Sequence, residues 1–171
     1  MTYTDFLELA QKRVSTREFS DKRIEKEDLE KILKACDIAP TGKNRRPIFY
    51  VILSSEEKKE RLFKLLPSLQ AKFYNADALL FSFVKQEDHL KELDCGAAIE
   101  NALLEATSLD IGSCWIHCAS AEMNTEEGKK TLKEVLDLDN EYEVLDCIAF
   151  GYPKNGRFAV KERSGNGSKI V

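Results

Sequence analysis

The sequence lacks the glycine-rich loops that bind nucleotide phosphates in many enzymes. Neither G-x-G-x-x-G nor G-x-x-x-x-G-K-[ST] occurs in its 171 residues. It also has only two histidines, and neither belongs to an H-E-x-x-H motif. These absences exclude the two common nucleotide-binding loops and the metalloprotease helix, and they leave few nucleophile–base pairs to consider.

An excess of positive charge is also absent. The 26 Lys and Arg residues are outnumbered by 30 Asp and Glu residues, which gives a net charge of −4. A general nucleic-acid binder needs a basic footprint, so we expect no nucleic-acid partner, and any polyanion site must be a local group of Arg and Lys. No segment approaches the ~20 consecutive apolar residues of a membrane span, so we expect no membrane insertion.

The N-terminal segment has neither the basic start nor the apolar core of a signal peptide, so we expect none. The cysteines are odd in number and scattered through apolar segments, which favours reduced thiols over a disulfide framework. They are Cys36, Cys95, Cys114, Cys118 and Cys147. We therefore expect a cytoplasmic protein.

Hydrophobic periodicity predicts a chain that alternates between helices and buried strands. The predicted helices span residues 2–12, 25–38, 54–67, 69–75, 90–109 and 124–136. Their expected N-caps include Thr2, Ser54 and Asn124, each with an acidic residue three positions later. The predicted strands span residues 48–53, 79–84, 111–116 and 145–150. This pattern, without repeats or a linker, indicates a single domain over residues 1–171 with a mixed sheet covered by helices.

The helix predicted at 90–109 is apolar around most of its circumference, which predicts burial on nearly all sides. Its many alanines allow another backbone to approach closely. In a chain this short, we expect the same helix of a second subunit to be the partner.

Basic residues gather at both ends of the chain. Arg13, Ser15 and Arg17 alternate, so in an extended segment they point to one side, where two guanidinium groups and a hydroxyl suit a phosphate. Lys161 and Arg163 repeat this spacing near the C-terminus. The alternatives are a solvated basic loop and a charged tail.

The segment Cys114-Trp-Ile-His-Cys118 allows two other hypotheses. A metal site would need ligands on one side, whereas Cys114 and His117 face opposite ways in the predicted strand. A nucleophilic Cys118 beside His117 would need an independently placed base. Buried thiols acting as small hydrophobic residues are the plainer interpretation.

Five motifs in order along nearly the whole chain resemble the FMN-dependent nitroreductase family, and in particular its short members. They are similar to the family's R-x-S-x-[RK] start, its A-P-S-x-x-N-x-Q-P loop, its long dimer helix with a G-x-x-W-I strand, its G-Y-P turn and its terminal K-x-R. The matching segments are Arg13-Val-Ser-Thr-Arg17, Ala39-Pro-Thr-Gly-Lys-Asn44 with Arg45-Arg46-Pro47, Asp94 to Ile116, Ile148-Ala-Phe-Gly-Tyr-Pro153 and Lys161-Glu-Arg163.

The resemblance implies an α+β, nitroreductase-like fold with a mixed, mostly antiparallel sheet. It also implies an intertwined homodimer, joined through the 90–109 helix and a swapped C-terminal tail, with FMN at the interface. The residues that it assigns to FMN are Arg13, Val14, Ser15, Arg17, Pro40, Thr41, Gly42, Asn44, Gln70, Trp115, Ile116, His117, Cys118, Lys161 and Arg163. Among them, Arg13, Ser15, Lys161 and Arg163 would hold the phosphate, and Arg17 would lie near the pyrimidine edge of the flavin.

By the same resemblance, Pro40, Thr41 and Gly42 would cover the flavin of the partner subunit, and Gln70 or Asn75 would contact the pyrimidine ring. His117 and Cys118 would fall where backbone groups meet flavin N5.

The sequence departs from the family pattern at several positions. Arg46 replaces the usual Gln, and Ile48 stands where an aromatic residue is frequent. His117 and Cys118 occupy positions where glycine is common, so we expect a narrower space over N5. Only residues 85–90 lie where many members carry a helical insertion over the flavin, which predicts an open cavity or an altered substrate class.

The resemblance implies that NADH or NADPH gives a hydride to flavin N5, which then passes it to an electron-poor small molecule such as a nitroaromatic or a quinone. The cofactor carries the chemistry, so no catalytic side chain is expected. One alternative keeps FMN and the fold but lacks turnover, as a redox sensor or carrier. Another is a thiol–metal protein without flavin.

Overall fold

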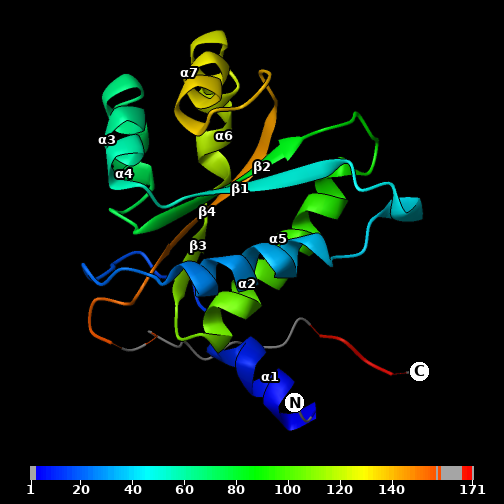
Figure 1. Ribbon diagram of the computed structural model, residues 1–171. Coiled ribbons are helices and arrows are strands. Elements are labelled where there is room, and N and C mark those ends of the chain that lie inside the picture. Colours follow the sequence, from blue (N-terminus) through cyan, green and yellow to red (C-terminus); the bar gives the residue numbers. More distant parts are fainter. Residues whose placement is uncertain (1–2, 157, 159–166, 171) are drawn as a thin grey trace.

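The computed structural model describes residues 3–156, 158 and 167–170, and the predicted phosphate ligands Lys161 and Arg163 lie outside them. The chain alternates between helices and strands in one layered body (Figure 1). The helices are α1 (Tyr3–Lys12), α2 (Lys26–Asp37), α3 (Glu56–Leu65), α4 (Ser68–Lys72), α5 (Lys91–Ser108), α6 (Ser120–Met123) and α7 (Glu126–Leu136), with 3₁₀ turns η1 (Gly42–Asn44) and η2 (His117–Ala119). The strands are β1 (Ile48–Leu53), β2 (Ala78–Val84), β3 (Gly112–Trp115) and β4 (Val144–Gly151).

The four strands form a sheet in the order β1-β2-β4-β3. All three pairings are antiparallel. The α+β class is therefore confirmed, but the sheet is not mixed as predicted. In the part of the chain that the structure describes, the parallel pairing is an isolated bridge between Ser15 and Ser113.

Helices cover both faces of the sheet (Figure 1). Helices α2 and α5 pack on one face, whereas α3, α4, α6 and α7 lie over the other. Strand β2 separates two apolar clusters, because Leu80 enters one and Leu79 and Phe81 enter the other. A strand buried on both faces needs a nearly continuous apolar run, which is why β2 lacks polar alternation. Strand β1 was also predicted to be buried, but it lies at the edge of the sheet and its middle residues are only partly buried.

Two helices begin one residue later than predicted. Ser55, not Ser54, caps α3, and its hydroxyl accepts from the N–H of Lys58 at 3.4 Å. Thr125, not Asn124, caps α7. Asn124 is occupied elsewhere, because its amide exchanges two hydrogen bonds with the backbone of Val144 at 2.7 and 2.8 Å.

Residues 90–109 were predicted to be buried on nearly all sides with a second subunit as the partner, and within one chain only part of this burial is present. Cys95, Ala98 and Ile99 enter the core, but Leu93 on the opposite side of α5 is 73% exposed. Helix α5 therefore presents an apolar side chain to solvent. No helix in the described ranges is both long and apolar enough to cross a membrane.

Candidate functional site

The segment after α1 runs as an extended chain beside the edge strand β3. The N–H of Thr16 donates to the carbonyl of Ser113 at 2.8 Å. Further along, Phe19 pairs with Pro153 in the turn after β4. Val14 is buried whereas Ser15 and Arg17 are exposed, which agrees with the predicted alternation for these residues, but Arg13 is half-buried.

Two glycines allow this segment to approach the sheet. A Cβ on Gly112 would lie 2.9 Å from the side chain of Thr16, and one on Gly151 would lie 2.8 Å from Phe19. Real Cβ atoms do not tolerate such contacts, so a larger residue would push the segment away.

Residues 14–18, which include the acidic Glu18, line a hollow of about 300 Å³ together with Pro153, Lys154 and Asn155. Ser15 contributes a hydroxyl and Arg17 a guanidinium group. Arg13 sits at the end of α1, where its Nε lies 3.8 Å from a carboxylate oxygen of Glu100. A hydroxyl and a guanidinium on one exposed edge are donors that a phosphate can accept from, so these residues fit the FMN that the resemblance implies.

The end of β3 differs from the prediction. The strand stops at Trp115, and His117 and Cys118 belong to η2 instead of continuing it. Cys114 is buried, whereas Trp115 is 41% exposed. The argument that Cys114 and His117 face opposite ways in one strand is therefore wrong. Among the residues that the structure describes, no group of three or more His, Cys, Asp or Glu side chains is placed to hold a metal ion.

One carboxylate joins the residues at this end of the sheet. Oδ1 of Asp146 lies 2.8 Å from Nδ1 of His117 and accepts from Nε1 of Trp115 at 2.7 Å. Asp146 is held in turn by Ser82, whose Oγ accepts from the Asp146 N–H at 3.0 Å and donates to the Asp146 carbonyl at 2.8 Å. Sequence reasoning missed Asp146, because 29 residues separate it from His117.

The thiols divide into buried and exposed groups. Burial raises the pKa of Cys36 and of Cys95 to about 12, and it raises the pKa of Cys147 well above the ordinary value. Burial also raises the pKa of Cys114, while the nearby positive charge of Arg17 acts in the opposite direction. Cys118 is exposed.

The second predicted binding loop lies at the far corner of the sheet, before β1 (Figure 1). Its Gly42 N–H donates to Oδ1 of Asp94 on α5 at 2.9 Å. Arg46, where the family pattern has Gln, donates to the Asp37 carbonyl at 2.8 Å and to Asn44 Oδ1 at 3.2 Å. Its backbone N–H also donates to Thr41 Oγ1 at 3.1 Å. Arg46 therefore closes the loop on itself and on the end of α2.

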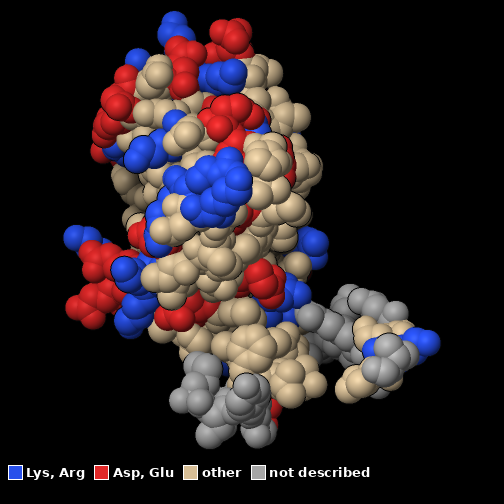
Figure 2. All heavy atoms as spheres, turned by 90° about the vertical axis from the view of Figure 1, so that its right-hand side faces the viewer, with Lys and Arg blue, Asp and Glu red and all other residues tan. Residues whose placement is uncertain are grey.

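The same loop carries a basic surface. Figure 2 shows Lys and Arg side chains gathered on the face that carries η1, where Lys43, Arg45 and Arg46 follow one another closely. Lys43, Asn44 and Arg46 all adopt left-handed backbone conformations. One chain does not bring this loop to Arg13–Arg17, because the two lie at opposite edges and opposite ends of the sheet (Figure 1).

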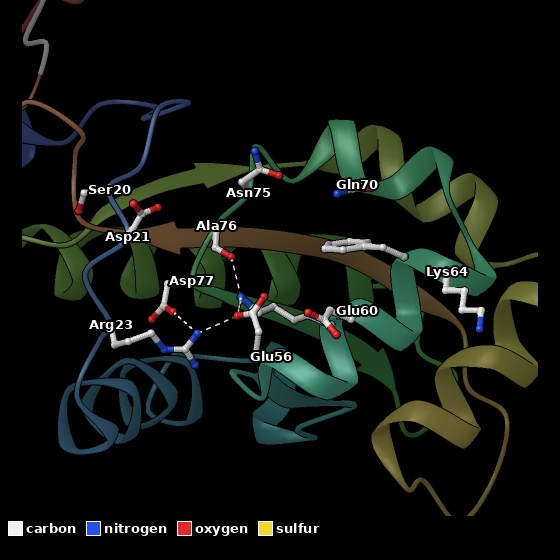
Figure 3. A pocket seen from close by; sticks show the side chains of 12 residues that line it. Ser20, Asp21, Arg23, Glu56, Glu60, Lys64, Gln70, Asn75, Ala76 and Asp77 are labelled. Atoms are coloured by element: carbon white, nitrogen blue, oxygen red, sulfur yellow. Dashed lines mark hydrogen bonds and ion pairs between the residues drawn. The ribbon is translucent and has the colours of Figure 1, made fainter.

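Gln70 lines a different cavity, of about 740 Å³, on the α3–α4 side of the sheet (Figure 3). Arg23 lines this cavity, and its Nη1 contacts Glu56 at 2.8 Å and Asp77 at 2.9 Å. The buried Lys59 donates to the Ala76 carbonyl at 3.0 Å. Asn75 also lines this cavity. The contact of Gln70 or Asn75 with a flavin ring stays a prediction.

The match to known proteins is to one family. The family model described as "Nitroreductase family" matches residues 10–87 and 65–152. A protein of Archaeoglobus fulgidus, provisionally named NADH dehydrogenase/NAD(P)H nitroreductase, is 33% identical over 156 residues, which cover 87% of this chain and 86% of the relative. The chain belongs to the nitroreductase family.

Solved structures agree with this assignment. A nitroreductase of Bacteroides fragilis with bound FMN has a TM-score of 0.84 and 25% identity, and the alignment covers 98% of each chain. An FMN-dependent nitroreductase of Clostridium difficile has a TM-score of 0.71 and 27% identity, with 94% of this chain and 92% of that chain covered.

Proposed function

We propose that the protein is an FMN-dependent NAD(P)H oxidoreductase that reduces electron-poor small molecules such as nitroaromatics or quinones. The observation that carries the proposal is the exposed edge formed by Ser15 and Arg17 beside β3, in a fold shared with an FMN-bound nitroreductase. When bound, FMN would supply the chemistry of hydride transfer between NADH or NADPH and the acceptor. The described residues supply binding and electrostatics.

The phosphate is held at the basic edge. Ser15 donates its hydroxyl, and Arg13 supplies positive charge at the end of α1, together with Lys161 and Arg163 of the tail. Arg17 is placed further along the same edge, toward Cys114, where its charge stabilises negative charge on a reduced ring. The other end of the proposed FMN site, away from the phosphate, is bordered by Trp115, Ile116, His117 and Cys118.

The working unit is a homodimer. The exposed Leu93 on α5 supports this proposal, and so does the separation of the two binding loops in one chain. Pairing α5 with its copy brings Pro40, Thr41, Gly42 and Asn44 of one subunit to the FMN of the other, with the C-terminal tail exchanged between subunits.

The decisive experiment mixes the FMN-loaded protein with NADH, and separately with NADPH, under anaerobic conditions while the flavin absorbance is followed. We expect bleaching with at least one nicotinamide and recovery when a quinone is added, with the parallel-line kinetics of a ping-pong reaction. A flavin that stays oxidised with both donors would overturn the proposal and would favour a flavin-binding redox sensor or carrier. That alternative draws on the exposed Cys118.

A further inference from the structure

Three side chains form a hydrogen-bonded cluster at the end of β3: those of His117, Asp146 and Trp115. The imidazole is 80% exposed, whereas the Asp146 side chain is only 12% exposed. The backbone N–H and carbonyl of Asp146 are both bonded to the Ser82 hydroxyl, which in turn accepts from the thiol of Cys95 on α5 at 3.2 Å. The cluster thus combines a rigid buried acceptor with an accessible base.

The geometry defines which nitrogen of His117 carries a proton. An ionised carboxylate can only accept, so Nδ1–H must be the donor to Asp146. Nε2 is then the ring nitrogen that Asp146 does not contact, and in a side chain that is 80% exposed it is the one available to give or to take a proton. This is the arrangement by which carboxylates orient histidines that act as acids and bases.

The proposed reaction needs such a group. Reduction of a quinone to a hydroquinone consumes two electrons and two protons. A hydride brings both electrons and one proton, so the second proton must reach an acceptor oxygen from another donor. The guanidinium groups of Arg13 and Arg17 cannot give up a proton, because Arg stays charged. Burial keeps Cys114 away from solvent.

We propose that His117 is the proton donor to the acceptor and that Asp146 is its positioning residue. The imidazolium gives the proton on Nε2 to an oxygen of the acceptor as the hydride arrives, and solvent returns a proton to the exposed ring. This inference rests on the proposed function. Among the residues that the structure describes, Asp146 from β4 is the ionisable group hydrogen-bonded to the ring, and Cys118 follows His117 in η2.

The test separates the two halves of the reaction by anaerobic stopped flow. The flavin is first reduced with NADH or NADPH and then reoxidised with 1,4-benzoquinone. In His117→Gln we expect the reoxidation rate to fall about 100-fold and to lose its pH dependence, because general acids typically contribute that much. Reduction by nicotinamide should fall far less. Asp146→Asn should shift the pH profile of reoxidation, since the ring loses its orienting acceptor.

The other histidine provides a matched control. His89 is also exposed and also neighbours a carboxylate, that of Asp88 at 3.5 Å. His89→Gln should leave both half-reactions unchanged. Cys118→Ser tests the competing acid, and a loss confined to that variant would overturn the assignment to His117. FMN content is measured for every variant, so that a slow rate is not mistaken for a lost cofactor.

A second readout needs no cofactor. Trp115 is the only tryptophan of the chain and shares the Asp146 oxygen with His117. Its fluorescence in flavin-free protein should therefore change with pH as the imidazole gains a proton. The change should vanish in His117→Gln and persist in His89→Gln.

The outcomes are distinguishable. A wild-type flavin that neither NADH nor NADPH reduces overturns the proposed function, and the catalytic role of His117 falls with it. A flavin that is reduced normally, together with wild-type reoxidation in His117→Gln, overturns the inference alone. Constant Trp115 fluorescence across the pH range in which imidazoles titrate would show that the three side chains do not form the cluster in solution.

Discussion

Thr16 lies directly over Gly112: a Cβ on that glycine would come within 2.9 Å of the threonine Cβ. We predict that Gly112→Ala displaces the Ser15–Arg17 edge from β3, at a cost of about 1–3 kcal/mol typical of overpacking. FMN affinity should fall, measured by fluorescence titration, in a protein whose circular dichroism remains that of the wild type. An unchanged dissociation constant in the folded variant would contradict the placement of the phosphate at this edge.

The basic residues from both ends of the chain should hold FMN together. We expect Arg13→Ala combined with Arg163→Ala to remove FMN while the protein stays folded, because each lost charge-assisted contact costs about 1.5–3 kcal/mol. The measurement is the ratio of flavin to protein after gel filtration. Arg61→Ala, on the exposed side of α3, is the control. Stoichiometric flavin in the double variant would refute the phosphate assignment.

Thiol labelling tests the end of β3. Four of the five cysteines are buried and Cys118 is exposed. The pKa of about 12 at Cys36 and Cys95 further suppresses their thiolates. We predict one fast-reacting thiol per native chain and five after denaturation, with the fast phase missing in Cys118→Ser. Saturating FMN should slow the fast phase, and labelling indifferent to FMN would place the cofactor elsewhere.

A carboxylate couples α4 to α6 in a pH-dependent way. The Ser68 hydroxyl and the Lys72 ammonium lower the pKa of Glu122. The ionised form therefore stabilises the fold above the pKa of an unfolded Glu, and this contribution is lost as the pH falls through the lowered folded value. Glu122→Gln should lose about 1 kcal/mol of unfolding free energy in urea at about pH 7, and its difference from the wild type should shrink as the pH is lowered.

Glu134 supplies the comparison for that experiment. Its carboxylate pairs with Arg61 on the surface, where both side chains are about half exposed. Glu134→Gln should change the stability by less than about 0.5 kcal/mol across the same pH range. A loss at Glu122 that persists in acid would show that the hydrogen bonds, and not the charge, stabilise the contact.

The open side of α5 should be an interface. Leu93→Glu places a charge where the dimer is proposed to pack, so we expect a folded monomer by sedimentation velocity, with FMN lost along with the partner's loop. Leu65→Glu alters an exposed leucine on α3 and should leave the oligomeric state unchanged. A dimer that survives Leu93→Glu would contradict pairing through α5.

Local patterns predicted most elements because their apolar runs are short and sharply bounded. The bounds predicted for β1 agree with the structure at residues 48–53. The cap of α3 was misplaced because Ser54 and Ser55 carry the same hydroxyl, and local sequence does not reveal which one faces the helix. The cap of α7 was misplaced because Asn124 bonds to a strand 20 residues away.

The parts of the candidate site that could be predicted from the sequence are those whose residues lie next to one another in the chain. The alternation of Val14, Ser15 and Arg17 in an extended segment follows from spacing alone. The contacts of Asp146 with His117 and of Asp94 with Gly42 do not, since they join segments 29 and 52 residues apart. Such pairs depend on strand register and helix docking, which single-sequence patterns do not encode.

The loop at Gly42 and the edge at Ser15 lie far apart in one chain, so each FMN site of the proposed dimer takes its edge from one subunit and its loop from the other. Subunit complementation should follow. A chain defective only at Arg13 and a chain defective only at Asn44, each inactive alone, should form hybrid dimers with one intact site. Mixing them should restore activity toward a quarter of the wild-type level when subunits exchange freely, because half of the dimers are hybrids and each carries one site of two.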